Sequence, residues 1–496
     1  MEIEAFSAGD FGGSGDRLDL DALPGPASTP VLGAFGNLAR FFADPIGYTD
    51  HLANGGYGET VVFARGMRRG ILWGKQAPAA VFLFGPQYMQ QLLTKHAMFP
   101  ESVLARVPSE WGRTARLTSG LLWMHGEAHR QHRRLIMPLF HHKRVQTYRD
   151  LMVSGIGEML DRLKPGESID MMAEGSRLLI EFQNQAVLGL PGMGGELAGL
   201  GEQMAEFFTL LGHPGVHLFP FNLPLTPRRR VLNLGNRVSQ GLDALVAAKL
   251  AANEEGSDVL SMLIRGRTED GQPLSADELV SETGHLFVAG WVSTRTAIAF
   301  TALLIAQHPE VAADLHDELT SVLHGDAPTI EQLAKLPLLD RVIKESMRLL
   351  PPVPLVSRAT TQPVQLGGYR LPPRTEFYLS IYHAHRQPDL FPEPRRFRPD
   401  RWNANEASQY SYLPFGIGSR TCPGMAMANL QLRILFAMLL QRYRLEMPRR
   451  SKIDGTGIGV MIPKPDVRLR VLKQDRQFGR SRGLVHGSLA RMVDFI

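Results

Sequence analysis

The chain has 496 residues, of which 44% are hydrophobic and 21% are charged, as in a globular protein that buries a large core. Its formal net charge of +5 is spread along the whole sequence, which argues against a nucleic-acid-binding protein. The single cysteine, Cys422, excludes an intramolecular disulfide and any zinc or iron–sulfur site that needs several cysteines.

The first part of the chain predicts a leader and a small sheet. Residues 1–22 are acidic and Gly-rich, so we expect a flexible leader with no signal peptide and no N-terminal anchor. Between Gly58 and Leu93, short apolar runs alternate with turn residues and are followed by a helical pattern. This order predicts a few strands and then a helix.

Most of the chain after about residue 120 is predicted to be helical. Ser275 followed by Glu278 forms a capping box, which starts a long helix that can continue to Gln307. The apolar part of this helix approaches the length of a membrane span, but Arg295 lies in its middle, where a charge is costly. We therefore predict a buried core helix, no transmembrane anchor and a cytoplasmic location.

Three further helices are expected nearer the C-terminus. One starts at Pro309, one ends at Pro351–Pro352, and one follows Gly424. Residues 353–402 are Pro-rich and extended, with short strand candidates. The predicted fold class is therefore mainly α with a minor β-sheet region.

The domain organisation is predicted to be simple. We find no internal repeat and no interdomain linker, so residues 23–471 are expected to form a single domain. Residues 472–496 form a basic C-terminal tail for which the sequence predicts no structure.

The cysteine lies in the sequence FGIGSRTCPG, Phe415–Gly424, directly before a predicted helix. The N-terminal end of a helix carries positive dipole charge and unpaired N–H groups, which stabilise a thiolate. Gly418 and Gly424 allow the backbone to curl closely around the sulfur, and Arg420 adds positive charge. The alternative for a lone cysteine is a small buried apolar side chain, but these surroundings favour a functional thiolate.

FGIGSRTCPG resembles the heme-binding loop of the cytochrome P-450 family, Phe-x-x-Gly-x-Arg-x-Cys-x-Gly, at every fixed position. The resemblance extends from about Leu23 to Val471 and implies the cytochrome P-450 fold, with heme b as cofactor and Cys422 as the iron ligand. It also implies further heme contacts, several of them to the propionates: His129, Arg133, Ala289, Gly290, Arg358, Phe415, Arg420 and Gly424.

Two other segments match the family. KESMRLLPP supplies Glu345 and Arg348, which share one helical face at i, i+3 and can pair. FRPDRW supplies Arg401. The resemblance implies that these three residues form a buried ion network that holds the cysteine loop in place.

The sequence AGWVST, Ala289–Thr294, resembles the central-helix pattern of the family, Ala/Gly-Gly-x-Asp/Glu-Thr-Thr/Ser. In the family, the acid and the alcohol of this pattern organise proton delivery to dioxygen. Here Val292 replaces the acid and Ser293 replaces the first alcohol. Ser293 and Thr294 are therefore the expected catalytic residues, able to order a water chain.

The resemblance implies a monooxygenase that inserts one atom of O2 into a small lipophilic substrate: a terpenoid, a fatty acyl chain or a polyketide-like molecule of secondary metabolism. Electrons would come from a ferredoxin or flavodoxin with an NAD(P)H-dependent reductase, and we expect a monomer. Arg130, Arg134 and Arg433 are either a docking face for that partner or ordinary surface arginines.

The substrate-contact regions of the family correspond to apolar residues in this chain, some of which fit a plain core role equally well. They are Leu286, Ala289, Val292, Val353, Leu355, Val356 and Ile458.

Three other functions remain open from the sequence. Val292 is compatible with a peroxide-driven or non-hydroxylating oxidation, such as coupling or dehydration. A heme-binding sensor without turnover would use the same cysteine loop. A zinc hydrolase would use His125, His129 and His132, although a mixed surface helix is the commoner cause of such a cluster.

Overall fold

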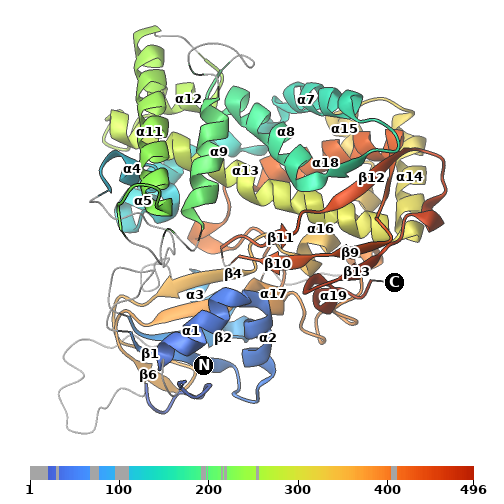
Figure 1. The fold of residues 1–496 in the computed structure, drawn as a ribbon. Helices are drawn as coiled ribbons and strands as arrows, with labels where there is room; N and C mark the ends of the chain where they lie inside the picture. Colours follow the sequence, from blue (N-terminus) through green and yellow to red (C-terminus); the bar gives the residue numbers. More distant parts are fainter. Residues whose placement is uncertain are drawn as a thin grey trace, which may run out of the picture.

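The computed structural model describes residues 20–29, 33–67, 77–94, 111–190, 197, 199–213, 216, 221–252, 256–403, 410–457 and 459–495. Figure 1 shows a large helical part and a smaller part built on a β-sheet near the N-terminus. The predicted fold class, mainly α with a minor β-sheet region, is confirmed. Most of the predicted leader lies outside the described residues.

The smaller part contains the sheet and its covering helices. The strands follow the order β1-β2-β7-β4, with β2 and β7 parallel and the other pairs antiparallel. The bounds are α1 (Ala34–Ala43), α2 (Pro45–Asn54), β1 (Thr60–Met67), β2 (Ala77–Leu83), α3 (Pro86–Thr94), β4 (Leu355–Ala359), β5 (Val364–Leu366), β6 (Tyr369–Leu371), β7 (Glu376–Ser380) and α17 (Ile381–Ala384). The predicted strands followed by a helix are confirmed at β1, β2 and α3.

The larger part contains the long helices. Their bounds are α4 (Arg113–Arg116), α5 (Gly126–Ile136), α6 (His142–Gln146), α7 (Arg149–Arg162), α8 (Met171–Ala186), α9 (Leu200–Leu211), α11 (Pro227–Ala252), α12 (Val259–Arg265), α13 (Ala276–Gln307), α14 (Pro309–Leu323), α15 (Ile330–Leu333), α16 (Pro337–Leu349) and α18 (Met425–Arg442). Short 3-10 helices lie at η3 (Leu121–Trp123), η4 (Met137–Phe140), η5 (Pro399–Asn403) and η6 (Gly418–Arg420).

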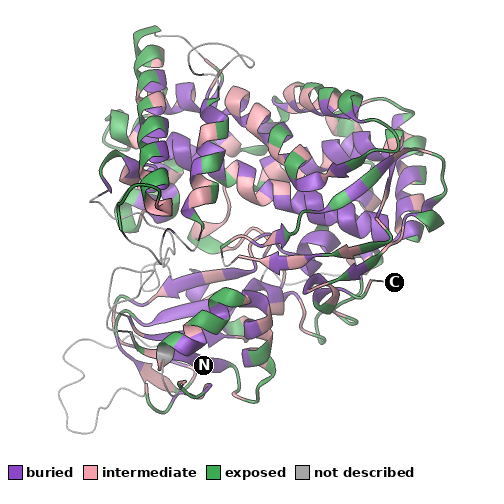
Figure 2. Ribbon diagram, in the orientation of Figure 1, coloured by how far each residue is buried: buried purple, intermediate pink, exposed green. Residues whose placement is uncertain are grey.

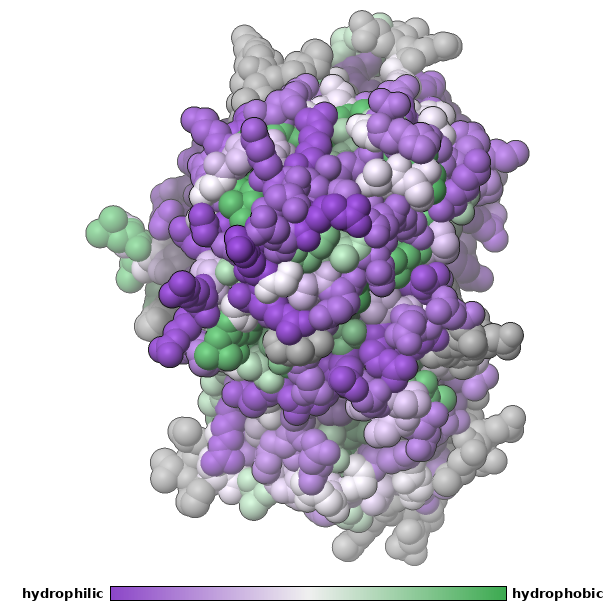
Figure 3. Space-filling model, turned by 90° about the vertical axis from the view of Figure 1, so that its right-hand side faces the viewer, coloured by the Kyte–Doolittle hydropathy of each residue, from purple (hydrophilic) through white to green (hydrophobic). Residues whose placement is uncertain are grey.

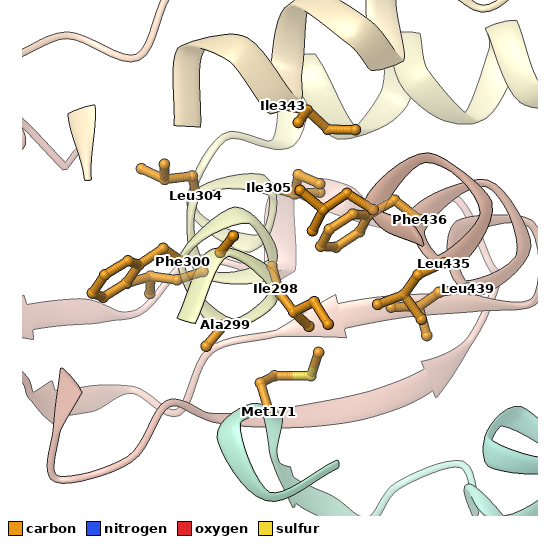
Figure 4. Close-up of a cluster of buried hydrophobic side chains, with 14 of the residues drawn as sticks. Met171, Ile298, Ala299, Phe300, Leu304, Ile305, Ile343, Leu435, Phe436 and Leu439 are labelled. Atoms are coloured by element: carbon orange, nitrogen blue, oxygen red, sulfur yellow. The ribbon is translucent and has the colours of Figure 1, made fainter. Parts of the chain in front are cut away.

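Helix α13 runs through the centre of the helical part (Figure 1). The predicted capping box is present, because Ser275 and Glu278 exchange side-chain and backbone hydrogen bonds at its start. Ile298 and Ile305 of α13 pack against Phe436 of α18 in the main core (Figure 4). Each such fully buried side chain stabilises the fold by about 1.5–3 kcal/mol.

Helix α13 is also the one described helix that is long and apolar enough to cross a membrane, but 67% of that stretch is buried inside the protein. Figure 2 shows the same burial along the ribbon. Arg295, the charge in its middle, stacks on the ring of Trp291 at 3.9 Å, and burial lowers its pKa to about 10. The prediction of a buried core helix is confirmed.

The last residues of the chain are packed rather than loose. Short strands form β3 (Ser168–Asp170), β8 (Tyr443–Glu446), β9 (Arg450–Lys452), β10 (Asp454–Thr456), β11 (Ile462–Lys464), β12 (Arg468–Lys473) and β13 (Leu484–His486), with η7 (Phe478–Arg480) and α19 (Leu489–Met492). Strand β13 pairs in parallel with β9, and Phe478, Leu489 and Val493 are buried in the main core. The segment without a sequence prediction therefore completes the hydrophobic core.

Apolar side chains are concentrated in the interior. In Figure 3, hydrophilic residues cover most of the visible face, and hydrophobic residues form small separate groups. This distribution is the one expected from the composition of the sequence.

Candidate active site

The cysteine loop folds back on itself before α18. The backbone N–H of Cys422 donates to the carbonyl of Phe415 at 2.9 Å, which closes the loop. Gly418 has a φ of +74°, and a Cβ there would lie 2.5 Å from the carbonyl oxygen of Leu93. A Cβ on Gly424 would meet the sulfur of Cys422 at 3.9 Å. The loop therefore needs glycine at position 418 so that it can lie against the end of α3.

The thiol of Cys422 is placed for a metal ligand. It is half-buried, directly before the N-terminal end of α18. Burial raises the pKa of the thiol, while the N–H of Gly424 and the charge of Arg133 oppose this rise. A coordinated metal ion would remove the proton outright, since metal-bound cysteine is a thiolate.

Two predicted cationic contacts converge on this loop. Arg133 of α5 donates to the carbonyl of Thr421 at 2.8 Å. Arg420 donates to the carbonyl of Leu121 at 3.2 Å and to Nδ1 of His125 at 3.3 Å. Positive charge is therefore held at the cysteine loop, where it suits the carboxylates of a heme.

The other two predicted propionate contacts are buried on different elements. His129 lies on α5 one turn before Arg133 and is 1% exposed. Arg358 lies on β4, where it is 3% exposed and donates to the carbonyl of Ser357.

One face of α13 is open in the middle of the protein. Ala289 is exposed and Val292 and Ser293 are half-buried, although most residues of this helix are buried. The hydroxyl of Ser293 donates to the carbonyl of Ala289 at 3.2 Å. Thr294 is buried, and at about 100° per residue it lies on a different side of the helix. The structure therefore brings Ala289, Val292 and Ser293 together, without Thr294.

Gly290 has a structural reason of its own. A Cβ there would lie 2.0 Å from the amide nitrogen of Gln183, which donates to the carbonyl of Phe287 at 3.0 Å. Gln183 on α8 is buried, so its amide depends on this bond. Sequence reasoning missed Gln183, because the contact joins helices that are distant along the chain.

The remaining predicted pocket residues separate into different environments. Leu286 packs in the core beside α11, and Leu355 packs in the aromatic core of the sheet with Tyr378. Val353 and Val356 are half-buried. Ile458 lies outside the described residues. Of the predicted pocket residues, Ala289 and Val292 thus lie together on the open face of α13, whereas Leu355 belongs to the core of the sheet.

Glu345 is the centre of a buried ion network. Its carboxylate accepts hydrogen bonds from Arg348 at 2.8 and 2.9 Å and from Arg401 at 2.9 Å. The structure thus brings the three predicted network residues together. Trp402 also donates its indole N–H to Glu345 at 3.0 Å, a partner that sequence reasoning missed.

His385 connects this network to the cysteine loop. Its Nδ1 contacts the carbonyl of Arg348 at 3.3 Å, and its Nε2 accepts the N–H of Leu413 at 2.8 Å. These two bonds require a neutral ring. Burial, together with the charges of Arg348 and Arg386, lowers the pKa of His385 to about 3. The sequence carried no signal for this role.

A pH dependence of stability follows from His385. Between its pKa of about 3 when folded and about 6.5 when unfolded, the unfolded chain binds a proton that the folded chain does not. The free energy of unfolding should therefore fall by about 2 kcal/mol between about pH 7 and pH 5 through this residue. Chemical denaturation measures this fall. It should be smaller by this amount in His385→Gln and unchanged in His51→Gln, which alters an exposed histidine. Equal losses in both variants would contradict the assignment.

The three surface arginines already have acidic partners, and the three histidines are not arranged around a common point. Arg130 pairs with Glu127, Arg134 with Glu269, and Arg433 with Asp340, as expected of ordinary surface ion pairs. Among the described residues, no group of histidine, cysteine or acidic side chains is arranged to hold a metal ion. His125, His129 and His132 therefore give no support to a zinc site.

Comparison with known proteins identifies the same family as the cysteine loop. Residues 70–471 match the family model described as Cytochrome P450. The chain is 31% identical to cyclooctatin synthase of Streptomyces melanosporofaciens, over 71% of this chain and 77% of that protein.

Two further comparisons agree. Cyclooctat-9-en-7-ol 5-monooxygenase of the same organism is 31% identical over 64% of this chain and 71% of its own length. A solved structure, retinoic acid-bound cyanobacterial CYP120A1, superposes with a TM-score of 0.75 at 22% identity, covering 91% of this chain and 99% of that one. The last similarity confirms the predicted fold.

Proposed function

Because the chain belongs to the cytochrome P450 family, and is therefore a monooxygenase that binds heme b through a cysteine thiolate, we propose that it oxygenates a terpenoid. The similarity to cyclooctatin synthase carries this proposal. The open face at Ala289 and Val292 supports it, since these two side chains are small and apolar and the only polar group among the three described residues of that face is the hydroxyl of Ser293. A rigid hydrocarbon skeleton gains most from such a surface.

The residues of the chain fit the group they would hold. Heme b, when bound, supplies O2 activation, and a thiolate ligand favours O–O cleavage. Cys422 would provide that ligand from a loop fixed by its own backbone hydrogen bond to Phe415. Arg133 and Arg420 would hold the carboxylates, since guanidinium stays charged and binds carboxylate in a bidentate manner. Ala289 would leave room for O2 and substrate.

The electrons would come from separate proteins. We propose a ferredoxin or flavodoxin with an NAD(P)H-dependent reductase as the donor, in the cytoplasm, acting on a monomer. The net charge of +5 supports an acidic partner. The pairing of Arg130, Arg134 and Arg433 with acidic residues means that such a partner would have to compete for them.

Ligand titration tests the substrate class. The heme-loaded protein is titrated with cyclooctat-9-en-7-ol and, in parallel, with palmitate, and the shift of the Soret band is recorded. We expect the terpenoid alcohol to saturate the shift at a concentration at least about tenfold lower, which corresponds to about 1.4 kcal/mol. Stronger binding of palmitate would overturn the terpenoid proposal while leaving the family assignment intact.

Peroxide-driven oxidation is the second candidate. It is favoured by Val292, which stands where the family has the acid that organises proton delivery. Turnover of cyclooctat-9-en-7-ol is compared with hydrogen peroxide alone and with reduced ferredoxin under air. Full activity with peroxide and none with ferredoxin would establish this alternative. We expect product with reduced ferredoxin, for which protons must reach the oxygen site.

A further inference from the structure

A buried histidine–carboxylate cluster joins α5 to α13. Glu282 of α13 is fully buried, and its Oε1 lies 2.8 Å from Nδ1 of His132, which is buried on α5. Neither residue belongs to the cysteine loop or to the Glu345 network. Ionisable side chains this deep in a core are costly unless they are paired, so the pair needs a reason.

The outer end of this cluster reaches the surface. Nε2 of His132 lies 3.3 Å from Oε1 of Glu278, whose side chain is 42% exposed. The other oxygen of Glu278 accepts from Ser275 in the capping box. Glu278 thus has one oxygen for the helix cap and one for His132, and it exchanges protons with water.

The inner end of the cluster lies one helical turn before the open face of α13. Oε2 of Glu282 lies 3.5 Å from Nδ1 of His285, which is also buried. His285 precedes Ala289 by one helical turn on the same face, about 6 Å along the axis. Glu278, Glu282 and His285 therefore form a row that leads from the start of α13 towards Ala289.

The cluster is tied to the cysteine loop through one backbone segment. The N–H of Leu121 donates to Oε2 of Glu282 at 3.2 Å, while the carbonyl of Leu121 accepts from Arg420 at 3.2 Å. A Cβ on Gly120 would lie 2.7 Å from Cβ of His285, so this segment lies directly on the row. Leu121 thus connects Glu282 to the residue two positions before Cys422.

The inner end also carries a free donor. The ring of Trp123 packs edge-on against His285, with 5.7 Å between the ring centroids. The indole N–H of Trp123 is buried and has no hydrogen-bond partner among the described residues. It remains available to a water molecule or a polar group beside His285.

The charges in the cluster act on one another. Burial alone would raise the pKa of Glu282, but the hydrogen bonds and charges of His132 and His285 hold that pKa at about 2. Burial opposes protonation of His132, but the carboxylates of Glu282 and Glu278 raise its pKa. At rest Glu282 is therefore ionised and free to accept a proton from His132, which it holds only briefly before passing it on.

The other charged groups near the cluster are occupied elsewhere. Arg116 of α4 pairs with Asp277 and with Asp243 of α11. Arg420 is directed to backbone carbonyls and His125. These groups surround the row but do not interrupt it.

We propose that Glu278, His132, Glu282 and His285 form a proton relay from the surface to the open face of α13. The relay takes the place of the acidic residue that the family has at the position of Val292. The inference rests on the proposed use of O2 and electrons rather than peroxide, and not on the identity of the substrate.

Each transfer has a donor atom and an acceptor atom. Glu278 gives a proton to Nε2 of His132, and His132 gives its Nδ1 proton to Oε1 of Glu282. A half-turn of that carboxyl group presents the proton to Nδ1 of His285, and His285 then releases its Nε2 proton to water, which carries it to Ala289 one helical turn further on. Water then reprotonates Glu278.

The stoichiometry matches the reaction. Oxygenation of a C–H bond converts R–H, O2, two electrons and two protons into R–OH and water, and the electrons come from the redox protein proposed above. The relay supplies only the protons, and each passage leaves both histidines in the opposite tautomer, so both rings must turn over before the next proton passes.

The Glu345 network shows what a purely structural cluster looks like in this protein. The side-chain donors to Glu345 are Arg348, Arg401 and Trp402, which present guanidinium and indole N–H groups. Glu282 is instead held between two histidines, the side chains that gain and lose protons at neutral pH. Only the second arrangement is able to pass a proton on.

Glu282→Gln is the main test. The amide oxygen still accepts the N–H of Leu121, but the side chain no longer carries a proton. Oxygen consumption driven by NADPH, plant ferredoxin and its reductase is measured without added substrate between about pH 5.5 and 8.5, around the usual histidine pKa. We expect the wild type to show a pH-dependent limb, and Glu282→Gln to lose it and to have a rate about 100-fold lower.

Two controls separate the relay from a structural role. Glu318→Gln removes a half-buried carboxylate that accepts the N–H groups of Leu338 and Leu339, and it should leave the rate unchanged. In the Val292→Asp background, Glu282→Gln should slow the rate only slightly, because the new carboxylate at position 292 delivers protons without the relay. His285→Gln breaks the inner step alone and serves if Glu282→Gln fails to retain heme.

A measurement independent of turnover completes the test. In the reduced, CO-bound holoenzyme with 15N-labelled histidine, the NMR titration midpoint of His132 should lie above the usual value and fall in Glu282→Gln. Wild-type rates and pH profiles in both Glu282→Gln and His285→Gln would overturn the relay. So would an equal loss in Glu318→Gln, or a His132 midpoint that does not respond to Glu282. Activity with peroxide alone would instead reject the proposed function.

Discussion

Cys422→Ala is expected to abolish the thiolate-type Soret band of the reduced, CO-bound protein and all oxygenase activity. Cys422 is the single cysteine of the chain, so no other sulfur is able to replace it as an iron ligand. Its backbone N–H still closes the loop onto Phe415 in the variant. The free energy of unfolding of the heme-free protein should therefore change by only about 1 kcal/mol.

Thr421→Val is the matched control for this experiment. The hydroxyl of Thr421 donates to the carbonyl of Gly418 at 2.8 Å, next to the cysteine but without a role as ligand. This variant should keep the thiolate-type band. Survival of that band in Cys422→Ala would refute the assignment of the cysteine.

Glu345→Gln is expected to have the next largest effect, on folding and heme retention. Arg348 is fully buried beside Glu345, so the substitution leaves a guanidinium in the core without its counter-charge. Breaking one partner of a buried ion pair costs about 3–5 kcal/mol. That is a large part of the stability of a typical domain. Chemical denaturation and the yield of heme-loaded protein measure this loss.

Glu393→Gln provides the comparison at the surface. Glu393 also pairs with arginines, Arg396 and Arg398, but all three side chains are solvent-exposed. Water screens such pairs, so this variant should unfold like the wild type. A similar loss in both variants would mean that burial of the Glu345 network does not matter.

The helices and the cysteine loop could be predicted because their signals are local. The capping box at Ser275, the proline at Pro309 and the glycines around Cys422 each act on neighbouring residues. The bounds of α13 and α14 follow directly from such signals. The same holds for Glu345 and Arg348, which lie one turn apart on α16.

The rest of the site depends on contacts between distant segments. Trp402 and His385 reach the network only after the Pro-rich segment has folded back onto α16. The family resemblance placed Gly290 among the heme contacts, but in the structure Gln183 of α8 lies where a side chain of residue 290 would be. These contacts leave no periodic pattern in the sequence, so they could not be predicted from it.

The row on α13 was hidden for a related reason. Glu278, Glu282 and His285 read as one polar stripe on an otherwise apolar helix, and His132 reads as part of a histidine-rich surface helix. Only the packing of α5 against the start of α13 shows that the carboxylate of Glu282 lies between two histidines. The proposed role of these residues therefore could not be predicted from either segment alone.

The contacts of the cysteine loop also govern the order in which the protein can assemble. Arg420 is bonded to Leu121 across 299 positions, and Arg133 is bonded to Thr421 across 288. Contacts between residues so far apart form late, because long loops must close before such contacts stabilise the chain. The loop should therefore acquire its final shape only after α5 and α16 have docked. Heme supplied late in expression should still be incorporated, whereas the isolated C-terminal half should not bind it.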